Sequence, residues 1–320
     1  MPTIVFSQEK MSIEDAIVVA LKNNYDIQLA ENSLLQAENN KSIYNTGFLP
    51  TISAAADARY ANSNATITDQ QGNERSINGV ITSGYGGSVG LNYILYNGGA
   101  RKFQYDKLKT QYELSDANKK LQIENTLIDV YTTFFNVART QEQQKTIEEA
   151  YKISKERLER VSVQHQYGKK TTLDILNAQV DANKDSISLV RINVTVENNK
   201  RNLNFLLGRE INTSFKTNNT VVLDETLSYE VLLQQLKSNN NSLKQIEINT
   251  AISQQELSIN KAGWLPSVST NVSYGYNFND NGPAGFLAAQ QTTGLNAGIN
   301  LNWNIFDGGT TKVRVQNAKI

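Results

Sequence analysis

Two stretches of the chain are near copies of each other: LNYILYNGG at residues 91–99 and LNWNIFDGG at residues 301–309. In both copies apolar or aromatic residues occupy every second position, Leu91, Tyr93 and Leu95 in one and Leu301, Trp303 and Ile305 in the other, before an Asn or Asp and two glycines close the run. Period-two alternation is typical of a β-strand, whose successive side chains point to opposite faces. The repetition therefore predicts two copies of one structural unit, each containing a strand that ends in this motif.

Two further pairs of segments follow the same order: NNYDI (23–27) with NNNSL (239–243), and FLPTIS (48–53) with WLPSVS (264–269). Each half reads as helix, strand, loop, strand, helix, with loops expected at residues 62–84 and 278–294. We predict a first repeat over residues 11–208, a connecting equatorial segment over 209–238, and a second repeat over 239–320 that is truncated after its second strand. Only eleven residues follow the second motif, so we expect the chain to be a fragment or a gene model cut short.

Four segments alternate strongly enough to predict strands of about nine to twelve residues, near the length of a tilted strand that crosses a bilayer. Four strands are too few to close a barrel, and an open edge in lipid leaves backbone groups unpaired, so spanning strands require other subunits. The alternative is a soluble sandwich with one buried face. The apolar or aromatic faces of the four segments are Ile52, Ala54, Ala56, Ala58 and Tyr60; Tyr85, Gly87, Val89, Leu91, Tyr93 and Leu95; Val268, Thr270, Val272, Tyr274, Tyr276 and Phe278; Leu295, Ala297, Ile299, Leu301, Trp303 and Ile305.

Residues 100–160 contain neither Pro nor Gly, and a continuous helix of that length would reach roughly 90 Å. Two later runs have coiled-coil spacing and predict an antiparallel helical hairpin with its tip near Gly168. Thr171 or Thr172 can cap its second helix, with Asp174 in the first turn. An ordinary coiled-coil scaffold has the same spacing and is the alternative for the helices alone. The spaced residues are Ile147, Tyr151, Ser154, Leu158, Val161 and His165, then Leu173, Leu176, Val180, Asn183, Ile187, Val190 and Val194.

Composition excludes several classes of protein. Lys+Arg and Asp+Glu both number 31, which argues against a nucleic-acid binder. No apolar run approaches the ~20 residues of a spanning helix, and no cysteine is present for disulfides or metal ligation. Residues 1–8 are apolar but lack the basic region of a full signal peptide, so they are either a signal remnant or a lead-in.

The sequence contains few residues suited to catalysis. A Ser-His-Asp triad would have to use His165, the single histidine, which lies on the predicted helical seam beside the tip. The glycine-rich residues 84–87 begin a predicted strand, whereas a phosphate loop follows a strand and opens a helix. We therefore expect no catalytic residue, no cofactor and no metal site.

Taken together, these motifs resemble the TolC-type outer-membrane efflux family, over residues from about 11 to 320. The most specific elements are the two aromatic-(Asn/Asp)-Gly-Gly motifs, together with a hairpin tip of the family's form. Tyr25 stands where the family usually has proline, and the second hairpin, which carries the constriction residues of the family, is absent. The residues that match the tip pattern are Arg157, Arg160, Gly168, Thr171, Thr172, Asp174, Ile175, Leu176, Ala178 and Gln179.

The resemblance implies a mixed α and β fold in which long antiparallel coiled-coil helices form an α-barrel in the periplasm. Each protomer of a homotrimer would contribute four transmembrane strands to a shared β-barrel in the outer membrane. The chain would be an exit duct for drugs, metals, toxins or exported proteins, working with a periplasmic adaptor protein and indirectly with an inner-membrane transporter. A soluble coiled-coil scaffold with a small β-sheet is the alternative, and an enzyme is a distant third. The residues expected to contact the adaptor are Tyr167, Gly168, Lys169, Lys170, Thr171, Thr172 and Asp174, although an exposed turn explains the two lysines equally well.

Overall fold

A computed structural model describes residues 9–68, 70–218, 228–282 and 287–320. The segment 1–8, interpreted above as a signal remnant or a lead-in, lies outside the described residues. The chain divides into two compact units: residues 1–36 with 115–245, and residues 37–114 with 246–320. Helices α2 (Tyr25–Asn40), α3 (Ala100–Gln166) and α6 (Asn241–Ala262) contribute residues to both units.

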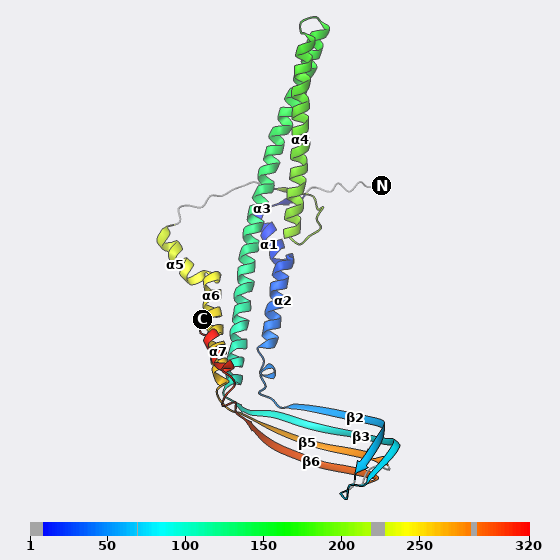
Figure 1. Cartoon of the computed structure of the whole chain (residues 1–320). Helices are drawn as coiled ribbons and strands as arrows, with labels where there is room; N and C mark the ends of the chain where they lie inside the picture. The colour runs from blue at the N-terminus through cyan, green and yellow to red at the C-terminus, as the bar shows by residue number, and fades with distance from the viewer. Residues whose placement is uncertain (1–8, 69, 219–227, 283–286) are drawn as a thin grey trace, which may run out of the picture. The chain divides into compact units, whose positions relative to one another are not determined.

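The first unit is built on a helical hairpin of α3 and α4 (Thr172–Leu206), which lie side by side (Figure 1). It also contains α1 (Ile13–Asn23), α5 (Tyr229–Asn239) and a parallel pair of short strands, β1 (Glu9–Met11) and β4 (Phe215–Thr217). The prediction of a long uninterrupted helix is confirmed, since α3 has 67 residues. A continuous core joins these elements, because Val130, Phe134 and Val137 of α3 belong to the same buried cluster as residues of α1, α4 and β4. Its buried members are Met11, Ala16, Ala20, Val130, Phe134, Val137, Leu203, Leu207 and Phe215.

The second unit contains a four-stranded antiparallel sheet in the order β2-β3-β5-β6. The strands are β2 (Thr51–Thr68), β3 (Glu74–Asn97), β5 (Ser267–Asp280) and β6 (Ala289–Asn302). A 3₁₀ turn, η1 (Ile43–Asn45), precedes β2, and α7 (Thr310–Asn317) follows the sheet. The central pairing of β3 with β5 joins the two halves of the chain in one sheet (Figure 1).

The strand lengths correct the sequence analysis. The strands have 18, 24, 14 and 14 residues, not nine to twelve. The expected loop at 62–84 is mostly paired strand, because pairing continues past Asn62 and Ile81, through a register shift between Ser63 and Ala65, to Thr68 and Glu74. The loop expected at 278–294 is likewise shortened by pairing up to Asp280 and Ala289.

The end of the fourth strand was also predicted wrongly. It stops at Asn302, so Trp303 and Ile305 lie outside it. The indole Nε1 of Trp303 instead donates a hydrogen bond to the carbonyl of Trp264 at 3.1 Å, which anchors this segment beside the end of α6.

None of the described helices combines the length and the apolar character that crossing a membrane requires.

Candidate functional site

The sheet has two chemically different faces, as its alternation predicts. The register places Ile52, Leu91, Val272 and Ala297 in one row across the four strands. This apolar face is largely open: Ile52 is 71% exposed, and Tyr274 on β5 is 58% exposed. The large apolar side chains of β6 on the same face are exposed as well, whereas the remaining large side chains of β5 are half-buried. A soluble sandwich would bury such a face, so the exposure disfavours that alternative. The exposed members include Tyr60, Tyr85, Val89, Tyr274, Leu295, Ile299 and Leu301.

The opposite face is polar and carries hydrogen bonds between neighbouring strands. Asn300 donates to Asn271 Oδ1 at 2.8 Å, and the guanidinium of Arg59 on β2 reaches across β3 to Asn279 on β5. Gly84 makes that crossing possible, because a Cβ there would lie 2.8 Å from Asn279 Oδ1. The sequence analysis did not single out these residues; the signal was a glycine directly opposite a charged residue on the neighbouring strand.

The sheet also has two open edges. Among the described residues, β2 pairs only with β3 and β6 pairs only with β5. Unpaired edge strands present rows of backbone N–H and C=O groups to a further strand. Further strands can therefore pair with the sheet at both of its edges, along β2 and along β6.

The hairpin tip is a compact turn whose shape is fixed by local bonds. Gly168 adopts a φ of 71°, a left-handed conformation that suits glycine at a helix end, and its N–H donates to the His165 carbonyl at 2.8 Å. The ring Nδ1 of His165 lies 2.8 Å from the Lys170 carbonyl, which ties the end of α3 to the turn. The predicted residues from Tyr167 to Asp174 thus lie together, and Tyr167 is 76% exposed.

The cap of α4 is at Thr171, one of the two positions predicted. Thr171 Oγ1 accepts from the Asp174 N–H at 3.2 Å, and Asp174 Oδ2 accepts from the Thr171 N–H at 2.9 Å. The hydrogen bonds from the backbone and the hydroxyl of Thr171 lower the pKa of the Asp174 carboxyl. Arg157 and Arg160 lie farther back on α3, within reach of Asp181 (3.4 Å) and Glu156 (3.7 Å), respectively.

Helix α4 carries two apolar stripes, which corrects the interpretation of its coiled-coil spacing. The residues that pack against α3 are a different set, including Ala178, Ala182, Ile192 and Val196, all buried. The predicted stripe lies about 170° away around the helix, at ~100° per residue. Its apolar members are exposed by 55–66%: Leu173, Leu176, Val180, Ile187, Val190 and Val194.

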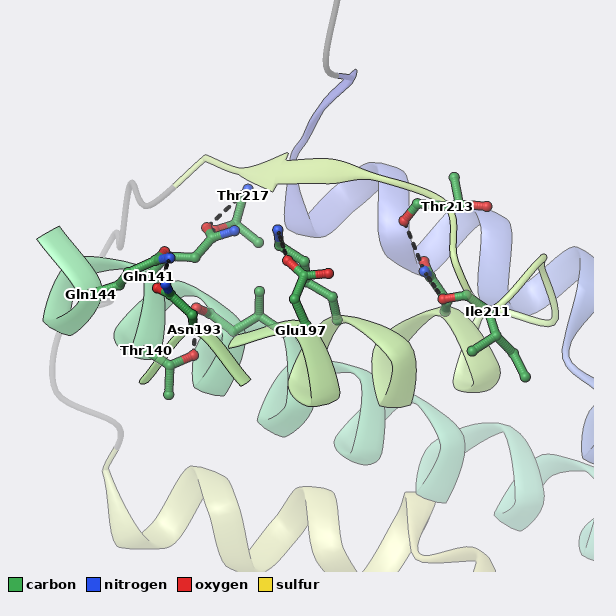
Figure 2. Close-up of polar contacts among 11 residues, drawn as sticks. Thr140, Gln141, Gln144, Asn193, Glu197, Ile211, Thr213 and Thr217 are labelled. Carbon is green, nitrogen blue, oxygen red and sulfur yellow. Dashed lines mark hydrogen bonds and ion pairs between the residues drawn. The ribbon is translucent and has the colours of Figure 1, made fainter. Parts of the chain in front are cut away.

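A layer of neutral polar contacts crosses the hairpin and β4 (Figure 2). Gln144 donates to Asn193 at 2.7 Å, and Asn199 donates to the buried Thr140 at 3.3 Å. The hydroxyl of Thr217 donates to Gln141 at 2.6 Å and so joins β4 to α3. These contacts tie α3 to both α4 and β4.

The buried Asn204 holds the chain that follows α4. Its amide nitrogen donates to the carbonyls of Ile211 and Thr213 at 2.7 and 2.9 Å (Figure 2). Its oxygen accepts from Arg209 at 2.6 Å. A fully bonded amide of this kind is stable when buried. The sequence analysis missed it, because a single Asn in a helix carries no distinctive signal.

The repeated Asn/Asp-Gly-Gly motifs begin helices in both halves. Asn97 Oδ1 accepts from the Arg101 N–H at 3.3 Å, four residues on, and Asp307 Oδ2 accepts from the Thr311 N–H at 2.8 Å. The hydroxyl of Thr311 makes the largest contribution to lowering the pKa of Asp307.

No group of three or more His, Cys, Asp or Glu side chains suited to a metal occurs within the described parts of the chain.

Comparisons with known proteins agree with this architecture. The TolC outer membrane protein of Vibrio cholerae is 22% identical over 216 residues, which cover 67% of this chain and 49% of that protein. The chain thus spans about half the length of this curated relative. The CmeC outer membrane channel of Campylobacter jejuni has a TM-score of 0.72 at 20% identity, covering 96% of this chain and 64% of its own. The MtrE outer membrane channel of Neisseria gonorrhoeae has a TM-score of 0.60 at 18% identity, covering 96% and 66%.

At these identities the solved structures show a shared fold, mixed in helix and sheet. They are outer-membrane channels and not enzymes. A family model described as outer membrane efflux protein matches residues 16–209 and 232–320, most of the chain. The chain therefore belongs to the outer membrane efflux protein family.

Proposed function

We propose that the protein is an outer-membrane exit duct for efflux or secretion, which works with a periplasmic adaptor and an inner-membrane pump. The observation that carries this proposal is the sheet, which has an exposed apolar face, a polar face and two open edges. In a bilayer the apolar face contacts lipid and the polar face lines water. The duct is passive, and the inner-membrane partner supplies the energy.

Backbone hydrogen bonding supports assembly from several copies. Strand edges are not tolerated in hydrocarbon, so the open edges of β2 and β6 need other strands. Four strands per chain close a barrel when the β6 edge of one copy pairs with the β2 edge of the next. Three copies give the twelve-stranded barrel of a homotrimer.

The exposed stripe of α4 supports a helical tunnel. A helix with one apolar stripe completes a two-helix hairpin, whereas a second stripe nearly opposite the first requires another helix on that side. Helices that each contact two neighbours form a curved wall. We propose that this wall is the periplasmic α-barrel.

The tip supports the proposal of an adaptor contact. Residues 167–172 and Asp174 form an ordered turn with an exposed Tyr167 and basic residues at 169 and 170. A rigid turn loses little conformational entropy when a partner binds. We propose that the adaptor binds this turn.

The order of elements supports the proposal of a duplication with repeats at 11–208 and 239–320 and a connecting segment at 209–238. Helices lead into β2 and β3 and then α3, and again into β5 and β6 and then α7. Asn24 and Asn240 also act alike, since each side chain accepts the N–H three residues on, at 3.1 and 2.9 Å.

Bilayer insertion tests the proposal with a pair of variants on β5. Val272→Arg places a charge on the apolar face, which costs about 2–4 kcal/mol at the bilayer midplane; Ser273→Arg places it on the polar face. The full-length protein and Ser273→Arg should insert and conduct in planar bilayers, and Val272→Arg should insert poorly. Absence of conductance from the full-length protein, or equal insertion of both variants, would contradict the proposal and favour the soluble scaffold.

A further inference from the structure

A row of alternating cations and aromatic rings runs along the start of α3, within the second unit. Arg101, Tyr105, Lys109 and Tyr112 recur every three or four residues and so share one face of the helix. The ammonium of Lys109 lies 4.0 Å from the ring centre of Tyr105, and that of Lys41 lies 3.5 Å over Tyr112. We call Lys41, Arg101, Tyr105, Lys109 and Tyr112 the cation–aromatic row.

Arg101 is the member of the row whose charge has no anion opposite it. Its guanidinium donates to the carbonyls of Gly47 and Leu95, both at 3.0 Å, and lies 5.1 and 5.6 Å from the ring centres of Phe48 and Tyr93. These partners are neutral, and no carboxylate lies within ion-pair distance of it among the described residues. A half-buried cation with neutral partners favours an added anion.

The two lysines of the row differ in this respect. Lys109 lies 3.2 Å from Asp106, and Lys41 lies 3.7 Å from Glu38. Both ion pairs are partly exposed and therefore weak. The lysines add positive potential around Arg101 and do not neutralise its charge.

The row begins where the apolar face of the sheet ends. Tyr93 lies on that face, since it pairs with Thr270 beside the row of Val272. Leu49 and Leu95 remain 45% and 44% exposed at the same level, and Tyr44 on η1 is 76% exposed. Exposed aromatic and basic residues at the end of an apolar band are typical of a membrane–water interface.

We propose that Arg101, assisted by Lys109 and Lys41, binds the phosphate of an anionic phospholipid in the inner leaflet of the outer membrane. The inference rests on the proposed function, which places the helical side of the sheet in the periplasm. Guanidinium matches phosphate in geometry and forms charge-assisted hydrogen bonds with it. The acyl chains then lie along the exposed apolar face below Leu49 and Leu95.

The second half of the chain lacks the equivalent site. Thr311 occupies the position four residues after Asp307 that Arg101 occupies after Asn97, and its hydroxyl donates to Asp307 at 2.6 Å. The side chain that would face a phosphate is therefore short, neutral and already bonded. We expect one lipid site per chain from the described residues.

Native mass spectrometry of the assembled full-length channel tests the inference with phosphatidylglycerol and phosphatidylcholine of matched acyl chains. The wild type should retain phosphatidylglycerol preferentially, and Arg101→Gln should weaken that binding about tenfold or more. Arg139→Gln is the matched control, because Arg139 is an exposed arginine farther along α3 and its replacement removes the same charge.

Arg101 also donates hydrogen bonds to two backbone carbonyls, so its replacement could disturb the fold. A second variant separates loss of lipid binding from loss of folding. Lys109→Gln, at an exposed position, should weaken phosphatidylglycerol binding about fivefold. Equal retention of the two lipids by the wild type, or variants that all behave like Arg139→Gln, would overturn the inference. Conductance in pure phosphatidylcholine tests the duct separately, so the two failures can be told apart.

Discussion

Replacing Val190 by aspartate tests whether the exposed stripe of α4 is covered by another helix in the assembled channel. Val190 is 60% exposed, whereas Ile192, two residues on, is 7% exposed and faces α3. In the chain by itself a carboxylate at position 190 points into water. Surface substitutions of this kind change the free energy of unfolding by no more than about 0.5 kcal/mol, so the hairpin should remain folded.

The cost in the assembled channel is larger. Full burial of a Val, Leu or Ile side chain is worth about 1.5–3 kcal/mol, and the six apolar members of the stripe are each more than half exposed. Covering them would therefore contribute about 5–10 kcal/mol per helix contact, an upper bound because the unfolded chain also buries some surface. A carboxylate trapped in that contact costs at least about 3 kcal/mol, or more than a hundredfold in the equilibrium constant.

Thr195→Asp is the matched control, because Thr195 is exposed on the same helix but on neither stripe. Light scattering on the detergent-solubilised full-length protein measures assembly, and circular dichroism measures helix content. We expect Val190→Asp to lose assembly and keep its helices, and Thr195→Asp to keep both. If Val190→Asp assembles as well as the control, the exposed stripe of α4 is not covered by another helix, and the proposal of a helical tunnel is refuted.

Three further predictions concern the first unit. Phe134→Ala opens a cavity in a fully buried site and should lower the free energy of unfolding by about 3–5 kcal/mol, measured by denaturant titration. Thr171→Ala removes the cap of α4 and should cost about 1 kcal/mol, read as faster amide exchange at the tip. Because Thr171 lowers the pKa of Asp174, protection of the tip should be present above the ordinary Asp pKa of 3.8 and be lost as pH falls through the lowered value. Gly208→Ala should disrupt the turn after α4, since its φ is 63° and the new Cβ would lie 2.2 Å from the Asn23 carbonyl; a melting temperature matching wild type would contradict this.

The existence of the strands could be predicted from sequence, whereas their ends could not. Alternation identifies a strand only where one face is apolar and the other is not. Beyond Tyr60, β2 continues through Asn, Ser and Thr with polar residues on both faces, so its pattern resembles a loop. Backbone pairing with β3, which no composition reveals, keeps this part in the sheet.

The helical pattern was similarly incomplete. Spacing of three and four residues shows which side chains share a face, but not what lies opposite. The apolar stripe from Leu173 to Val194 is more conspicuous than the one that packs on α3, because the latter relies on Ala178 and Ala182. Small residues permit close helix contact and give a weak hydrophobic signal, so the seam inside the hairpin was assigned to the wrong stripe. The cap at Thr171, by contrast, depends on local chemistry and could be predicted.

Three surfaces of the chain lack a partner in the single copy, and together they constrain the environment of the protein. The open edges of β2 and β6 need backbone partners, which only other strands provide. The apolar face around Ile52 and Leu295 needs an apolar medium, and the stripe around Val190 needs another helix. A soluble scaffold would satisfy the stripe but leave the sheet exposed to water, and a single copy in a membrane would leave its edges unpaired. The assembly that we propose, which closes the sheet within a bilayer and packs helix against helix outside it, would satisfy all three.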